Sequence, residues 1–263
     1  MRAGRILAGV RSLLAAVLLL AASAPAVAAG GEPPRPTLTV FAASDLAFAF
    51  QELVPRFEQA VGVRVTLVLG SSGQFAHQIA QGAPADVFFS ADEQFVERLA
   101  RQGAVLPETR TLYAQGRLAL VAARGGPRLT ELAQLREARV RRVAIANPVH
   151  APYGRTAVEA LQRVGVWAAV EPKLVYAENV RQALQYVQSG AVEAGVVALA
   201  VALGSGLDWA PVDPRLHAPL NQAAAVVRRS ARPELALAFL QFVNGPEGRP
   251  VMKRYGFLLP GEF

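Results

Sequence analysis

Short apolar segments alternate with helical patterns in the first half of the chain. The segments 38–43, 63–69 and 86–90 are apolar runs of strand length. A turn follows each segment, and apolar residues then recur every three to four positions, which predicts a helix. This alternation is typical of parallel strands joined by right-handed crossovers, so it predicts a doubly wound α/β sheet. Pro55 lies inside the first helical pattern, and we expect it to kink or shorten that helix.

The same alternation continues to the end of the chain. Further strands are predicted at 117–122, 143–146, 173–176, 195–200 and 223–227, and further helices at 154–164, 180–188 and 233–243. We interpret the chain as two α/β lobes. The first lobe comprises residues 36–118 and 222–263, and the second lobe, residues 119–221, is inserted between these two parts.

The first 29 residues have the features of a secretory signal peptide. Arginines precede an apolar run at 12–22, and small residues follow it. A membrane anchor is the alternative, but it would need about 18 continuous apolar residues. We therefore expect export to the periplasm, with cleavage near Ala28 or Ala29. The signal contains no cysteine for lipid attachment.

Composition and charge exclude several kinds of chemistry. The chain of 263 residues has no cysteine and three histidines, which excludes a disulfide framework, Cys-ligated zinc and a cysteine nucleophile. The formal charge is +7, and removal of the three arginines of the predicted signal leaves +7 − 3 = +4. The remaining basic residues are scattered, so the sequence does not indicate a nucleic-acid partner.

Four predicted helix starts carry candidate ligand-binding residues. They lie at Ser44-Asp45, at 70–73 (Gly-Ser-Ser-Gly), at 151–154 and at 178–180. In open α/β sheets ligands bind beyond the carboxyl ends of the strands. Each helix start offers unpaired backbone N–H groups and about half a positive charge. Together they indicate an anion site built without Arg or Lys, although each polar residue could also be only a helix cap.

Catalytic and cation-binding interpretations have weaker support. Residues 70–73 lack the lysine of a phosphate-binding P-loop and do not match the G-x-S-x-G pattern of a hydrolase. A secreted hydrolase that uses Ser72 or Ser44 with a histidine and Asp86 remains an alternative. Asp86 and Asp92 flank a predicted strand, where capping or turn roles are expected and a metal pair is the minor alternative.

Six short motifs carry a resemblance to a known family. In order, spacing and number they resemble the molybdate-binding periplasmic proteins of ABC importers. The motifs are Val40–Ser44, Gly70–Gly73, Gln81–Asp92, Ala146–Gly154, Glu178–Leu184 and Lys253–Phe257. They span about residues 37–258, which is nearly the whole chain after the predicted signal.

The resemblance implies a type II solute-binding fold, in which two lobes of mostly parallel sheet and flanking helices close on one tetrahedral oxyanion. Neutral hydroxyl and backbone N–H groups hold that oxyanion in the family. Matched by motif, the residues are Ser44, Ser72, Tyr153 and Val180, with Asn179 as an additional candidate. Molybdenum would be bound as molybdate through these residues, without a direct cation site, a cofactor or any catalysis.

One position departs from the family pattern. Many members place a tyrosine hydroxyl on the ligand where this chain has Ala198, and Tyr153 or Asn179 could replace that donor. Asp45 also adds a carboxylate beside the anion, although as a helix cap it could point away from the cleft.

The resemblance thus implies a periplasmic monomer that captures molybdate, and tungstate as well, for an ABC permease in the inner membrane. The nearest alternative is the same scaffold with another oxyanion, such as sulfate or phosphate. The effector lobe of a regulator is a third interpretation, which the export signal and the lack of a DNA-binding helix pair oppose.

Overall fold

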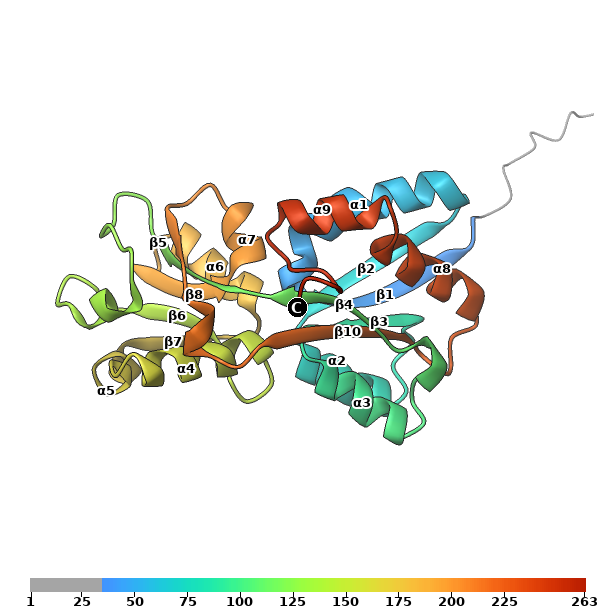
Figure 1. Cartoon of the computed structure of the whole chain (residues 1–263), viewed down its shortest axis with the longest axis horizontal. Helices are drawn as coiled ribbons and strands as arrows, with labels where there is room; N and C mark the ends of the chain where they lie inside the picture. Colours follow the sequence, from blue (N-terminus) through green and yellow to red (C-terminus); the bar gives the residue numbers. More distant parts are fainter. Residues whose placement is uncertain (1–34) are drawn as a thin grey trace, which may run out of the picture. The chain divides into compact units, whose positions relative to one another are not determined.

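The computed structural model describes residues 35–263, which form two lobes around two five-stranded sheets (Figure 1). The predicted signal peptide and its cleavage site lie outside the described residues. The first sheet has the strand order β2-β1-β3-β10-β4, and the second has the order β7-β6-β8-β5-β9. No helix within residues 35–263 has the length and apolar character needed to cross a membrane.

The first sheet is built from both ends of the described chain. Its strands are β1 (Thr37–Ala43), β2 (Arg64–Gly70), β3 (Val87–Ser90), β4 (Thr111–Gly116) and β10 (Leu220–Val226). Strands β1, β2 and β3 pair in parallel, whereas β10 pairs antiparallel with both β3 and β4. Four of the five strands therefore point the same way, and β10 is the reversed one.

The second sheet repeats this arrangement. Its strands are β5 (Leu118–Ala122), β6 (Val143–Ala146), β7 (Leu174–Ala177), β8 (Ala194–Ala198) and β9 (Trp209–Pro211). Strand β6 pairs in parallel with β7 and β8, and β5 runs antiparallel to β8 and β9. The chain enters this lobe through β5 and leaves it after β9, so the reversed strand of each sheet is the one that follows a crossing between lobes.

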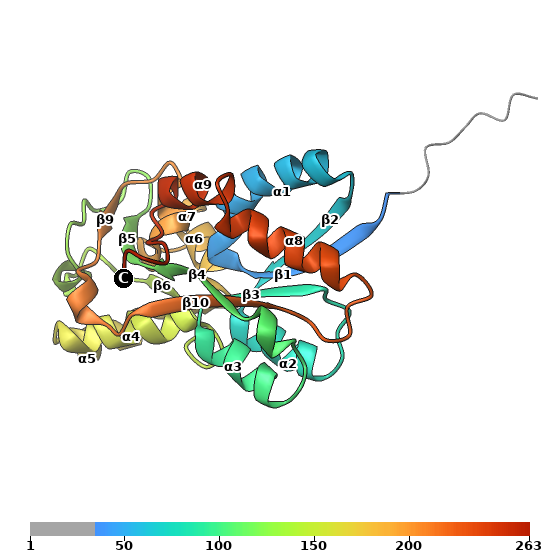
Figure 2. The same cartoon turned by 45° about the vertical axis from the view of Figure 1, so that its right-hand side comes forward.

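Helices cover both faces of each sheet (Figures 1 and 2). In the first lobe, α1 (Ala47–Val61), α8 (Pro233–Asn244) and α9 (Gly248–Arg254) pack on one face, and α2 (Ser72–Ala80) and α3 (Glu93–Arg101) on the other. The helices of the second lobe are α4 (Pro152–Arg163), α5 (Trp167–Val170), α6 (Val180–Gln188) and α7 (Leu199–Leu203). Separate apolar clusters fill these layers, and Phe50, Phe57, Phe89 and Phe239 pack edge to face in the first lobe.

Two local expectations differ from the structure, and some elements were not expected. The first helix runs through Pro55 to Val61, so the expected shortening is wrong. Pro55 and Gln51, whose carbonyl loses its helical partner, are both exposed, and water can solvate that carbonyl. The apolar segment predicted as a strand to residue 200 ends at Ala198, where the short helix α7 begins. Strand β4 and helix α9 were not predicted.

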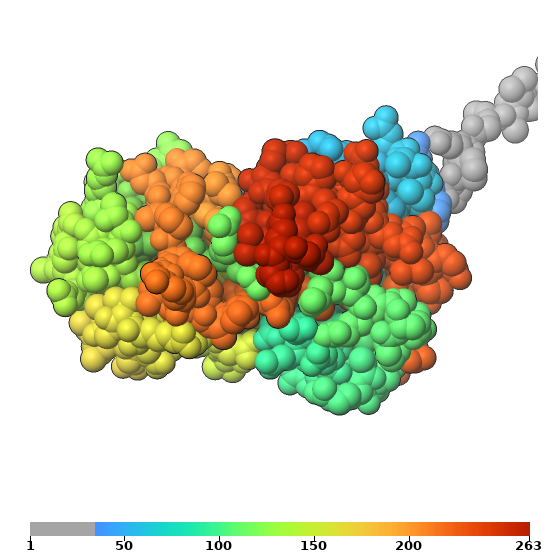
Figure 3. Space-filling view, in the orientation of Figure 1, coloured from blue at the N-terminus to red at the C-terminus, as the bar shows by residue number. Residues whose placement is uncertain are grey.

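The C-terminal segment covers the junction of the lobes (Figure 3). The backbone groups of Leu258 and Gln115 exchange two hydrogen bonds of 2.8 and 3.1 Å. Arg117 Nε donates to the carbonyl of Gly256 at 2.9 Å. Residues 256–258 therefore brace the end of β4, where the chain crosses from the first lobe to the second.

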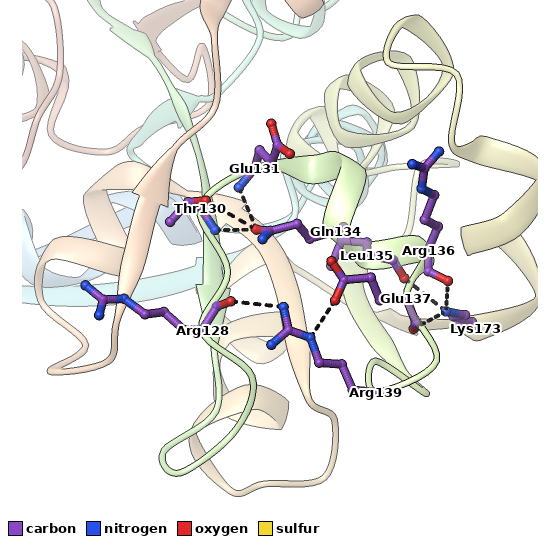
Figure 4. Close-up of polar contacts among 9 residues, drawn as sticks. All are labelled: Arg128, Thr130, Glu131, Gln134, Leu135, Arg136, Glu137, Arg139 and Lys173. Carbon is purple, nitrogen blue, oxygen red and sulfur yellow. Dashed lines mark hydrogen bonds and ion pairs between the residues drawn. The ribbon is translucent and has the colours of Figure 1, made fainter.

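A half-buried lysine braces the outer part of the second lobe (Figure 4). Lys173 Nζ donates to the carbonyl oxygens of Leu135, Arg136 and Glu137 at 3.0, 3.1 and 3.0 Å. These carbonyls end the short 3-10 helix η3 (Leu132–Arg136), whose last groups have no helical partner. One ammonium group thus satisfies three carbonyls and ties η3 to the segment that enters β7.

Candidate functional site

A small cavity lies between the lobes at the carboxyl ends of β1, β2 and β6. The space between its walls is about 200 Å³, which includes space open to solvent. Its walls come from both lobes and include the starts of the 3-10 turn η1 (Ser44–Leu46), α2, α4 and α6. The lining residues are Ala43, Ser44, Asp45, Gly70, Ser71, Ser72, Ala91, Ala151, Pro152, Tyr153, Asn179 and Val180.

The structure brings together all five residues that the sequence analysis selected. Ser44 and Ser72 reach the cavity from the first lobe, and Tyr153, Asn179 and Val180 reach it from the second. Ser44 and Ser72 are 4% and 1% exposed, so water does not compete at their hydroxyls. Parallel strands that end at one edge bring Ser44 close to Ser72 in the first lobe and Tyr153 close to Val180 in the second. The two edges face each other across the cavity.

The two serines are held so that each can donate a hydrogen bond. Ser72 Oγ accepts a hydrogen bond from the N–H of Ala91 at 2.9 Å, and Ser44 Oγ accepts one from the N–H of Arg181 at 3.4 Å. A serine hydroxyl has one proton and two lone pairs. Because both oxygens act as acceptors toward the protein, their protons are available for a ligand oxygen.

Two backbone N–H groups complete the donor set. Tyr153 and Val180 lie in the first turns of α4 and α6, where N–H groups have no helical acceptor. Within residues 35–263, no protein group accepts a hydrogen bond from either N–H. The N-terminal ends of these helices also carry a partial positive charge, so the arrangement favours an anion.

Asn179 has a structural contact in addition to its place at the cavity. Its Oδ1 accepts a hydrogen bond from the N–H of Gln182 at 3.0 Å, which is the geometry of a helix N-cap. This contact occupies the carbonyl end of the side chain and leaves the amide NH₂ as the only end that could act as a donor. Ala198, the position at which the family resemblance implies a tyrosine, is completely buried.

The Tyr153 hydroxyl is engaged away from the expected ligand. It donates to Asp45 Oδ2 at 2.9 Å and accepts a hydrogen bond from Gln222 Nε2 at 3.1 Å. Gln222 Nε2 also donates to Asp45 Oδ2 at 2.7 Å. Asp45 is therefore not a helix cap, and its carboxylate is turned toward these two side chains. The hydroxyl of Tyr153 consequently does not replace the donor that Ala198 lacks, and Tyr153 offers its backbone N–H.

Burial dominates the electrostatics of Asp45. Desolvation raises the pKa of its carboxyl from 3.8 to about 6, although hydrogen bonds from Gln222 and Tyr153 oppose this shift. The pKa of Tyr153 is raised well above its usual value, first by burial and then by the charge of Asp45. Both tyrosine and carboxyl protons are thus retained to higher pH than in water.

The lobes also contact each other around the cavity. The N–H of Gly73 donates to the carbonyl of His150 at 3.0 Å, and Ser71 Oγ donates to the same oxygen at 2.6 Å. Nearer the surface, Gln74 Nε2 donates to Glu178 at 2.6 Å, and Asp92 forms an ion pair with Arg155. The sequence analysis did not identify Ser71, Gln222 or these contacts, because the partners come from opposite lobes.

The residues of the hydrolase alternative are not assembled. Asp86 accepts hydrogen bonds from the Thr39 N–H and the Ser230 hydroxyl, and His77 is exposed on α2. His150 Nδ1 lies 2.9 Å from Ser71 Oγ, but that hydroxyl donates its proton to a carbonyl. Asp92 caps α3. In the described part of the chain, no three acidic or histidine side chains cluster as ligands for a metal ion.

Comparison with known proteins identifies relatives of this chain. The sequence model of a family described as bacterial extracellular solute-binding protein matches residues 38–258. The molybdate-binding protein ModA of Rhodobacter capsulatus is 35% identical over 211 residues, covering 79% of this chain and 82% of the relative. ModA of Azotobacter vinelandii is 33% identical over 224 residues, covering 83% and 88%.

A solved structure extends the similarity to the fold. The periplasmic molybdate-binding protein of Azotobacter vinelandii superimposes with a TM-score of 0.79 at 32% identity. The match covers 85% of this chain and 99% of the other. The two-lobed α/β architecture is therefore shared over nearly the whole of the described chain.

Proposed function

The chain belongs to the bacterial extracellular solute-binding protein family, and from this premise we propose that it captures molybdate in the periplasm for an ABC transporter. The family is described as one of bacterial extracellular solute-binding proteins. In this proposal the protein breaks no bond and needs no cofactor. It binds the anion between its lobes and delivers it as a monomer to a permease in the inner membrane.

One observation carries the proposal: the buried cavity offers neutral donors and no cation. The donors are the hydroxyls of Ser44 and Ser72 and the N–H groups of Tyr153 and Val180. They come from both lobes, so a tetrahedral oxyanion can bind all four only when the lobes are closed. The relatives named for molybdate binding share about a third of their residues with this chain.

The same donor set gives a basis for selectivity. A buried donor left without a partner costs about 1–3 kcal/mol. An oxyanion smaller than molybdate cannot reach donors on both walls at once, and it forfeits this energy at each donor it misses. We propose that tungstate, a tetrahedral oxyanion of nearly the same size, binds as well, and that sulfate and phosphate bind weakly.

Isothermal titration of the exported, ligand-stripped protein tests the proposal. Molybdate, tungstate, sulfate and phosphate are titrated in parallel under the same conditions. One-to-one binding of molybdate and tungstate with no heat from sulfate or phosphate is the expected result. Heat from sulfate or phosphate alone would contradict the molybdate assignment and keep the role in transport. No heat from any of the four anions would contradict the oxyanion site itself.

A further inference from the structure

We propose that Asp45, Tyr153 and Gln222 form a latch between the lobes that holds the anion site closed and positions the backbone N–H of Tyr153. The inference rests on the proposed function, because it assigns a role in ligand release to side chains beside that site. None of these three side chains is needed as an anion ligand. They affect binding because they fix the position of the Tyr153 N–H donor and stabilise the closed state of the two lobes.

The hydroxyl of Tyr153 carries the contact between the lobes. Tyr153 belongs to α4 of the second lobe, whereas Asp45 follows β1 and Gln222 lies in β10, both in the first lobe. The hydroxyl donates to Asp45 Oδ2 and accepts from Gln222 Nε2, so one oxygen atom makes both bonds across the cleft. The hydrogen bond from Gln222 to Asp45 fixes the two first-lobe partners relative to each other.

Burial makes these bonds stronger than the two side-chain contacts that join the lobes nearer the surface. Asp45, Tyr153 and Gln222 are 1%, 3% and 0% exposed. Hydrogen bonds to a charged group in such surroundings are among the stronger ones in proteins. The side chains of Gln74 with Glu178 and of Asp92 with Arg155 meet nearer the surface, where water competes for the same groups.

The chain leaves space for the latch at the point where it crosses between lobes. Gly116 ends β4 and pairs with Leu220 of β10, so it lies at the junction. A Cβ atom at Gly116 would be 2.1 Å from the Tyr153 hydroxyl oxygen and 2.6 Å from Gln222 Nε2. A glycine is therefore required at position 116 for the latch to form, and this steric fit is independent of the hydrogen bonds.

The geometry connects the latch to the ligand through one residue. The backbone N–H of Tyr153 lines the cavity while its side chain is fixed in the first lobe. Opening of the lobes must break both hydrogen bonds of the hydroxyl before the anion can leave. The latch is formed only in the closed state, so its loss should change the dissociation rate and leave the association rate nearly unaltered.

Substitutions at Tyr153, Tyr113 and Asp45 test this role. Tyr153→Phe deletes both bonds across the cleft and keeps the ring and the backbone N–H. Tyr113→Phe is the matched control, because Tyr113 is equally buried and donates to the Ser90 carbonyl at 3.2 Å within the first lobe. Asp45→Asn is the conservative variant, because its amide retains an oxygen that can accept from the Tyr153 hydroxyl and from Gln222 Nε2 while the charge is removed.

Rates of molybdate binding and release are measured with dyes on the two lobes. The chain has no cysteine, so cysteines introduced at the exposed positions Gln59 and Gln185 are labelled selectively. We expect Y153F to release molybdate at least about tenfold faster, with an association rate within about threefold of the parent. Y113F should stay within about threefold in both rates. D45N keeps an oxygen for the Tyr153 hydroxyl but loses the charge, so it should release molybdate faster than the parent and more slowly than Y153F.

Ligand-free protein provides a second measurement with the same dyes. Single-molecule energy transfer between the lobes should show a smaller closed fraction for Y153F than for the parent and for Y113F. Equal closed fractions and equal release rates in Y153F and Y113F would overturn the latch. Failure of the parent to bind molybdate would contradict the proposed function, and the closed fractions of the ligand-free variants would still decide whether the latch exists.

Discussion

The side-chain oxygen of Ser72 lies 2.9 Å from the backbone nitrogen of Ala91 and accepts its hydrogen bond. Ser72 begins α2, and Ala91 follows β3, so the bond joins two loops at the carboxyl edge of the first sheet. It fixes the hydroxyl as an acceptor toward the protein, which leaves its proton for a ligand. A residue that could have been only a helix cap is thereby oriented toward the cavity.

Replacement of Ser72 by alanine should weaken molybdate binding about tenfold to a hundredfold. The variant removes one ligand donor, and the loss of about 1–3 kcal/mol corresponds to this change in affinity. The Ala91 N–H loses its partner in the free and the bound protein alike, so that loss lowers stability and not affinity. Titration calorimetry measures the change. Ser205→Ala is a suitable control, because this serine is also buried but bonds to Ala202 and Leu207 within the second lobe. Equal affinity of S72A and S205A would remove Ser72 from the site.

Substitution of Gly73 by alanine should prevent full closure of the lobes. A Cβ atom there would be 2.5 Å from the carbonyl oxygen of His150, which belongs to the opposite lobe. Backbone cannot yield as a flexible side chain does, so the lobes must separate and the anion loses donors on one wall. We expect at least about a tenfold loss of affinity at unchanged thermal stability. Gln78→Ala, on the exposed face of the same helix, is the control and should bind molybdate like the parent. If G73A also bound molybdate like the parent, binding would not require the close approach of Gly73 to His150.

Because of the raised pKa of Asp45, the protein should be more stable near pH 4 than near pH 7. Burial raises this pKa to about 6 in the folded protein, whereas in the unfolded chain it is near 3.8. Below pH about 4 both states hold the proton. Between pH about 4 and 6 the folded state holds a proton that the unfolded state has lost, so the free energy of unfolding falls as the pH rises.

The size of this effect follows from the shift of about 2 pKa units, which corresponds to about 3 kcal/mol between pH 4 and 7. Urea unfolding at several pH values measures it. Asp45→Asn should abolish this slope. Asp213→Asn should retain it, because Arg215 lowers the pKa of the Asp213 carboxyl to about 2 and it titrates below this window. Parallel pH profiles for the parent and D45N would contradict the raised pKa of Asp45.

Lys173→Met should destabilise the second lobe without altering the anion site. The variant leaves the carbonyls of Leu135, Arg136 and Glu137 without the ammonium group that they share. We expect a loss of about 1–3 kcal/mol in the free energy of unfolding and an unchanged affinity of the folded protein. Lys253→Met is the control, because Lys253 forms an exposed ion pair with Glu262, and such pairs contribute about 0–1 kcal/mol. Equal stability of the two variants would show that η3 does not depend on Lys173.

Local pattern was sufficient for most of the secondary structure. The apolar period of the helix at 180–188 and the uninterrupted apolar run at 143–146 coincide with α6 and β6 at both ends. Both elements pack one continuous face against the core, so their boundaries follow from the side chains themselves. Strand β4 was missed because its pattern is mixed, and it is fixed by pairing with β10, which is more than 100 residues away.

The candidate site was predictable for a related reason. Serines and unpaired N–H groups at strand ends are visible in the sequence, and parallel sheets bring such ends to one edge. The direction of each side chain was not visible. Tyr153 was a candidate to replace the hydroxyl missing at Ala198, and its hydroxyl is instead bonded to Asp45 and Gln222.

The sequence by itself therefore determined most of the elements, the junctions that carry donors and the family resemblance, because these depend on residues close together in the chain. Only the tertiary structure decided which donors of the two lobes face each other across the cavity. It also decided where the carboxylate of Asp45 points. Asp45 meets a partner 108 residues away and another 177 residues away. Contacts of that separation depend on how two independently packed sheets close, and no local periodicity encodes that geometry.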